Sequence, residues 1–135
     1  MTSRNLPTPE RSGIYRAPRE LAPVRKRIGG RWCDVDLQAV RDKAALLAAI
    51  ARACGFPPDF GGNWDALADA LQDDSWLGSG PFVLNLRNAA PAAGALGDAW
   101  ATLLEVLQFS LIYWKERSEL FVVFVDGGAG LPSWQ

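Results

Sequence analysis

Apolar residues in the second half of the chain recur at helical and strand spacings in alternation. Leu46, Leu47 and Ile50 follow a helical period, and Asp42 before them and Gly55 after them are typical of helix ends. The same period predicts a longer helix starting at Asp98, whose apolar positions are Trp100, Leu103, Leu104, Leu107, Leu111 and Trp114.

Two short runs between these helical patterns, residues 82–86 and 120–125, are almost wholly apolar and predict strands buried inside a sheet. The alanine-rich segment 89–96 is interrupted by proline and glycine, so we expect a loop or a short helical turn there. Strands that alternate with helices predict an α/β fold with a mostly parallel sheet covered by helices.

The N-terminal part of the chain has a weaker pattern. Gly29-Gly30 separates two extended runs, residues 24–28 and 31–37, which predicts a β-hairpin and with it an added N-terminal hairpin strand. Residues 1–23 hold four prolines and little apolar content, so we expect a loosely ordered basic arm. The α/β domain is therefore expected over residues 24–126, with a flexible tail over 127–135.

Charge is divided between the two parts of the chain, although the net charge is only −1. Residues 1–31 contain eight basic and two acidic residues, whereas residues 32–135 contain six basic and thirteen acidic ones. The total therefore favours neither a nucleic-acid-binding protein nor a strongly acidic one, but a basic arm precedes an acidic domain.

Several classes of chemistry lack their usual residues. The chain has no histidine, and its two cysteines, Cys33 and Cys54, lack metal-ligand spacing. We therefore expect a protein that is not an enzyme and that has no catalytic residues, no cofactor and no metal site. Neither a signal peptide nor a membrane-spanning run is visible in the sequence, so we expect a cytoplasmic protein with no membrane partner.

Acidic residues are concentrated between residues 57 and 86, where the chain has five aspartates and no lysine or arginine. Asp65, Asp69 and Asp73 are spaced four apart, which places them within an arc of about 80° on a helix, opposite the apolar stripe formed by Trp64, Leu67, Ala68 and Leu71. Like charges at this spacing destabilise a helix, and no basic residue on it relieves them. Such a ridge favours a surface that binds a basic partner.

The segment 56–71 has a motif of its own. Its elements are Phe60-Gly61, then Asn63 followed by an apolar residue and Asp65-Ala66-Leu67, then Asp69 and Leu71. This motif resembles the signature of the barstar family, whose members are intracellular protein inhibitors of ribonucleases. The resemblance extends in element order over residues 31–126 and implies a small α/β domain with a three-stranded parallel sheet.

The resemblance also implies how such a protein binds. Asp69 matches the aspartate that enters the phosphate site of the ribonuclease, and Asp65 matches a second aspartate that contacts the basic rim. Asn63 and Gly61 belong to the contacting loop. The expected partner is one molecule of a basic ribonuclease or a related basic toxin protein. The expected contact residues are Asp59, Phe60, Gly61, Gly62, Asn63, Asp65, Ala68, Asp69, Asp73 and Trp76.

Two positions depart from the best-known inhibitor of the family, which has aromatic residues where this chain has Asp59 and Ala68. We expect Trp76 to take the place of an aromatic residue found nearby in that relative. The departures favour a different but related basic target.

Two other interpretations of the acidic face remain open. The first is a non-inhibitory interaction module that binds another basic protein or the chain's own basic arm, and nucleic acid is a less favoured partner for that arm. The second is a hydrolase using paired aspartates, which is the weakest because a convex helix face offers no cause for a raised pKa.

Overall fold

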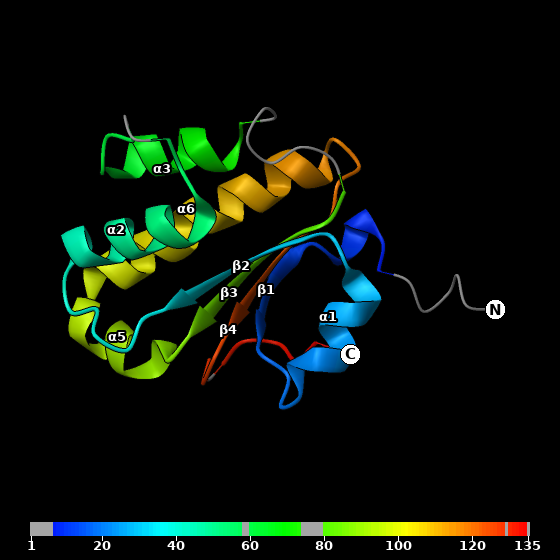
Figure 1. The fold of residues 1–135 in the computed structure, drawn as a ribbon, viewed down its shortest axis with the longest axis horizontal. Coiled ribbons are helices and arrows are strands. Elements are labelled where there is room, and N and C mark those ends of the chain that lie inside the picture. The colour runs from blue at the N-terminus through cyan, green and yellow to red at the C-terminus, as the bar shows by residue number, and fades with distance from the viewer. Residues whose placement is uncertain (1–6, 58–59, 74–79, 129, 135) are drawn as a thin grey trace.

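The computed structural model of the chain describes residues 7–57, 60–73, 80–128 and 130–134, and its centre is a parallel sheet of four strands. The strands are β1 (Gly13–Arg16), β2 (Arg31–Asp36), β3 (Phe82–Arg87) and β4 (Phe121–Val125), hydrogen-bonded in the order β1-β4-β3-β2 (Figure 1). The predicted α/β class is confirmed. The sheet has one strand more than the three expected, because β1 joins it from the N-terminal segment.

One face of the sheet carries the larger part of the core. It is covered by α2 (Lys43–Cys54), α5 (Ala89–Leu96) and α6 (Asp98–Lys115), while α3 (Trp64–Leu71) packs mainly on α6 at the periphery (Figure 1). The predicted stripe of the long helix supplies four of the buried side chains, Leu103, Leu107, Leu111 and Trp114.

The helix ends follow the capping chemistry of the sequence. The Asp42 carboxylate accepts a hydrogen bond from the backbone N–H of Ala45 over 2.8 Å, and Gly55 ends α2 in the left-handed conformation. The segment 89–96 forms the eight-residue helix α5, not the loop or short turn that was expected. Pro91 lies in its first turn, where a missing N–H costs nothing, and Ala92 and Leu96 are buried.

The predicted hairpin is wrong in its first half, because residues Leu21–Ile28 form the helix α1. Leu21, Val24 and Ile28 share one side of this helix and pack on the second sheet face, with Val83, Val122 and Phe124. Gly30 has a φ of 71°, and a Cβ there would lie 2.2 Å from the carbonyl oxygen of Pro81. The glycine pair therefore makes a tight turn, but from a helix into β2.

The predicted loose arm and tail are also revised. Within the described part of the arm, Pro9–Arg11 forms a 3-10 turn and β1 pairs in parallel with β4, where Ile14 lies opposite Val123. The tail returns to the same edge, and the ring of Trp134 lies 5.0 Å from that of Tyr15. These contacts join residues more than a hundred positions apart, so local composition does not reveal them.

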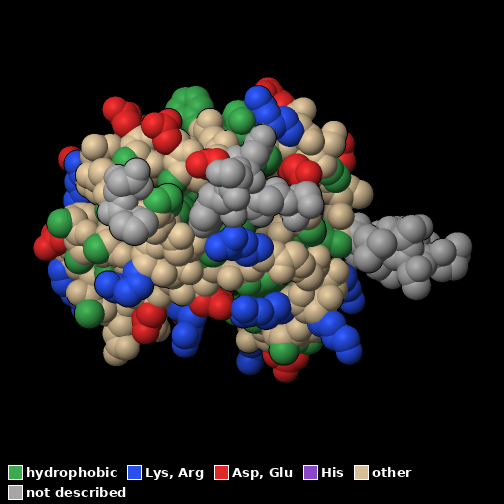
Figure 2. All heavy atoms as spheres, turned by 45° about the horizontal axis from the view of Figure 1, so that its top comes forward, with side chains coloured by type: hydrophobic (Ala, Val, Ile, Leu, Met, Phe, Trp, Pro, Cys, Tyr) green, Lys and Arg blue, Asp and Glu red, His purple; other side chains and the backbone are tan. Residues whose placement is uncertain are grey.

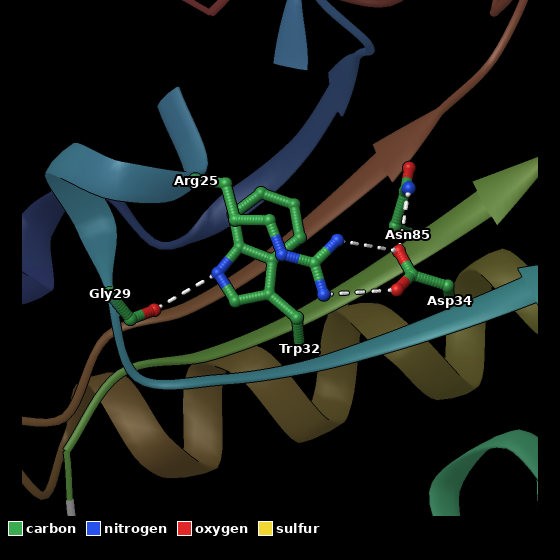
Figure 3. Close-up of polar contacts among 5 residues, drawn as sticks. All are labelled: Arg25, Gly29, Trp32, Asp34 and Asn85. Atoms are coloured by element: carbon green, nitrogen blue, oxygen red, sulfur yellow. Dashed lines mark hydrogen bonds and ion pairs between the residues drawn. The ribbon is translucent and has the colours of Figure 1, made fainter. Parts of the chain in front are cut away.

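A polar cluster fixes α1 to the sheet (Figure 3). The Arg25 guanidinium donates to both carboxylate oxygens of Asp34, over 3.3 and 3.1 Å, and lies 4.8 Å from the Trp32 ring centroid. Trp32 donates to the carbonyl of Gly29 over 2.9 Å, and Asn85 donates to Asp34 over 3.0 Å. Partial burial opposes ionisation of Asp34, but the hydrogen bonds from Asn85 and Arg25 outweigh it and lower its pKa.

Candidate partner-binding surface

The helix α3 begins at a cap that the motif itself supplies. The Asn63 side-chain oxygen accepts a hydrogen bond from the backbone N–H of Ala66 over 2.7 Å. Gly62, with a φ of 70°, makes the turn before it. Phe60 is half-buried in the same loop, and its ring lies 5.1 Å from that of Phe56. Asn63 thus has a structural task in addition to its expected place in the contacting loop.

The opposite end of α3 is fastened to α6. Leu67 and Leu71 are fully buried in the main core. The indole N–H of Trp114 donates to the carbonyl oxygen of Leu71 over 2.6 Å. Burial on one side and capping at both ends hold α3 in a single orientation, which leaves its other side facing outward.

Asp65 and Asp69 are exposed on that outer side of α3. Within the described residues, neither forms an ion pair or a side-chain hydrogen bond. Asp73 is exposed too, but it lies beyond Leu71, where α3 ends, so the predicted three-aspartate ridge is two aspartates on the helix and one after it.

The remaining expected contact residues are distributed as follows. Gly61, Gly62 and Asn63 are exposed in the loop before α3, and Ala68 is partly exposed on the helix. Asp59 and Trp76 lie outside the described residues.

A groove of about 480 Å³ runs between α3 and α6, and Asp65 forms part of its wall. Its walls are formed by Trp64, Asp65 and Ala68 of α3 with Gln72 just after it, and by Val106, Phe109, Ile112 and Tyr113 of α6 with Glu116 just after it. Phe109 and Glu116 were missed by the sequence reasoning. A signal was available for Phe109, because it lies on the side of the long helix opposite the core stripe, where a large apolar side chain is not needed for packing.

Acidic side chains gather on the upper part of the face in Figure 2, over α3 and the end of α6, whereas lysine and arginine are more numerous below them. The basic residues of α1 lie on the other side of the sheet, where Arg25 pairs with Asp34. In the described part of the arm, Arg11 lies over the ring of Trp134 and Arg16 donates a hydrogen bond to Ser133, so neither pairs with Asp65 or Asp69.

In the described ranges no group of three or more metal-binding side chains could hold an ion. No single helix there is long and apolar enough to cross a membrane, although α5 and α6, which meet at 114°, satisfy the length and composition test when taken together.

Comparison with known proteins gives one family match. Residues 31–126 match the family model described as Barstar (barnase inhibitor). No curated protein matches the chain. The matched range contains α3 and both walls of the groove, whereas β1 and α1 precede it.

Proposed function

The chain belongs to the barstar family, and we propose that it inhibits a ribonuclease by placing α3 against the active site of the enzyme. One observation carries this proposal. Asp65 and Asp69 lie one turn apart on an exposed helix face, without a cationic partner among the described residues, and the helix is anchored by the fully buried Leu67 and Leu71.

Such a pair of carboxylates can bind the cationic groups that hold a phosphate. A ribonuclease holds an anionic phosphate with basic side chains, and a carboxylate accepts the same paired N–H donors from a guanidinium group. The two aspartates repel each other at four-residue spacing, so pairing with cations relieves a cost present in the free protein. Asp69 takes the place of the substrate phosphate, and Asp65 pairs with the surrounding basic rim.

The fixed position of α3 favours tight binding for a separate reason. The cap at Asn63 and the Trp114–Leu71 hydrogen bond order the helix before the enzyme arrives. Little conformational entropy remains to be lost on association. One inhibitor molecule binds one enzyme molecule, in the cytoplasm where the inhibitor protects its own cell. Ala68 makes the contact surface differ from that of the best-known inhibitor, so the target is a related but different basic enzyme.

The proposal is tested with the small basic secreted ribonuclease encoded in the same genome. We expect a one-to-one complex by sedimentation, loss of RNA cleavage when the chain is added, and weaker binding as salt concentration rises. Asp65→Ala/Asp69→Ala should weaken inhibition by at least about a hundredfold, since buried charge pairs at interfaces contribute several kcal/mol.

The matched control is Glu10→Ala/Glu20→Ala, which changes the net charge by the same amount on the exposed N-terminal segment. It should inhibit as the wild type does. Equal inhibition by the wild type and the Asp65/Asp69 variant would overturn the assignment of α3. Binding to a basic protein without any effect on RNA cleavage would instead favour the non-inhibitory interaction module.

A further inference from the structure

The groove between α3 and α6 has a chemistry that phosphate mimicry does not use. We infer that the ribonuclease partner inserts a large apolar side chain, with a lysine or arginine beside it, into this groove. The inference rests on the proposed function, because it describes a second contact of the same interface. It differs from that function in naming an apolar feature that the enzyme's surface must carry.

The groove exposes apolar surface to water. Phe109 is 71% exposed and Ile112 is 40% exposed, and these are the large hydrophobic side chains of the described residues that remain most open to water. Both lie on the groove, three residues apart on α6. Single exposed hydrophobic residues are common, but two that line one concavity are typical of a contact surface.

The shape of the groove suits a large side chain. Ala68 projects into the groove from α3 with a single methyl group, and Trp64 and Tyr113 contribute larger walls around it. The volume of about 480 Å³ exceeds what bound water needs and lies in the range of sites that take a bulky organic group. An aromatic or long aliphatic side chain entering there would contact both helices, and large side chains that pack into a partner's surface are typical of binding hot spots.

The groove is also acidic. Asp65 belongs to one wall and Glu116 to the other, and the described residues that line it include no lysine or arginine. Two cations lie against rings of the walls, Lys43 over Trp64 and Arg117 over Tyr113. Asp65 also belongs to the proposed phosphate-mimicking face. An enzyme bound to α3 would therefore contact the groove within the same interface.

A second copy of this chain is a poorer occupant than a basic enzyme. A symmetric dimer through the groove would bring Asp65 and Glu116 of one copy toward the same residues of the other, and like charges across an interface are destabilising. A partner with a cation beside its apolar side chain gains from the same two carboxylates.

The experiment measures the dissociation constant of the complex with the ribonuclease from the same genome, at several salt concentrations. Phe109→Ser removes the exposed ring, and Ala68→Trp fills the groove with the chain's own side chain. We expect each to raise the dissociation constant at least tenfold with the same salt dependence as the wild type. Gln108→Ser, on an exposed position of α6 outside the groove, is the matched control and should bind normally.

The outcomes separate the two proposals. If Asp65→Ala/Asp69→Ala weakens binding and flattens its salt dependence while Phe109→Ser and Ala68→Trp bind as the wild type does, the groove inference is wrong and the proposed function stands. If the wild type forms no complex with the enzyme, both are wrong. If sedimentation shows a dimer of the free chain that Phe109→Ser dissociates, the groove serves a second copy and the inference is overturned.

Discussion

The indole N–H of Trp114 donates a hydrogen bond of 2.6 Å to the backbone carbonyl of Leu71, which joins the last turn of α6 to the last turn of α3. Both residues are buried, so neither group has water as an alternative partner. The contact fixes the distance between the acidic helix and the helix that forms the other wall of the groove.

Replacement of Trp114 by phenylalanine should therefore destabilise the fold. The Leu71 carbonyl would lose its donor in a buried place, which costs about 1–3 kcal/mol in the free energy of unfolding. Urea unfolding followed by circular dichroism measures this difference. Trp100→Phe, at a half-buried position of α6, is the control and should cost less. An unchanged free energy of unfolding in Trp114→Phe would contradict the structural role of the bond.

The cap of α3 gives a second prediction. Asn63→Ala removes the acceptor for the Ala66 N–H and should lower the free energy of unfolding by about 1 kcal/mol. Asn63→Asp keeps an acceptor at the cap and should stay close to the wild type. Thermal unfolding of the three proteins in the absence of any partner tests this. Equal losses in the alanine and aspartate variants would show that the cap is not the cause.

Much of the domain could be predicted from local signals. The helices that begin after Asp42, at Trp64 and at Asp98 have capping residues or apolar periods that a short window of sequence displays. The acidic face was predictable in the same way, because Asp65 and Asp69 are four residues apart and their relation needs only the helix itself.

The parts that could not be predicted depend on distant contacts. Ile14 becomes a strand residue because it pairs with Val123 at the edge of β4. No residue near Ile14 in the sequence indicates this pairing. Gly29-Gly30 suits a hairpin turn and equally a helix-to-strand turn, so only the packing of α1 on the sheet decides between them. The groove likewise forms only when α3 packs on α6. The sequence alone therefore does not show that the exposed side chain of Phe109 lines a groove.

Ionisation of Asp34 gives a prediction about acid stability. Its pKa in the folded chain is lowered, against the effect of burial, by hydrogen bonds from Asn85 and Arg25. The stabilisation is therefore present above the unfolded pKa of about 4 and is lost as the pH falls through the folded value. The difference in free energy of unfolding between the wild type and Asp34→Asn should be largest near neutral pH and shrink in acid.

The contribution of Arg25 to this effect is measured by combining Asp34→Asn with Arg25→Ala. When Asp34→Asn is introduced into the Arg25→Ala protein, its pH-dependent effect on the free energy of unfolding should be smaller, since the guanidinium no longer favours the carboxylate. The ion pair is partly exposed, so the effect on total stability stays below about 1 kcal/mol. An effect of Asp34→Asn that is independent of Arg25 would show that the pair contributes nothing.

The N-terminal addition gives a fourth prediction. Deletion of residues 1–28 leaves the family-matched range intact, but it removes β1 from the edge of β4 and uncovers Val122 and Phe124. We expect the free energy of unfolding to fall by at least about 3 kcal/mol, and soluble yield to fall with it, because apolar surface and an unpaired strand edge become exposed. Deletion of residues 1–6 alone is the control. A stable, soluble chain lacking 1–28 would show that β1 and α1 are dispensable for folding.

We propose that Asp69 occupies the phosphate site of a ribonuclease. The most direct measurement is competition between this chain and a nucleoside monophosphate that binds the same enzyme, followed by the apparent dissociation constant of the inhibitor complex. Binding of the inhibitor and the nucleotide should be mutually exclusive, so that this constant rises in proportion to nucleotide concentration once the site is saturated. An inhibitor that binds equally well whether or not the nucleotide is in place would contradict it.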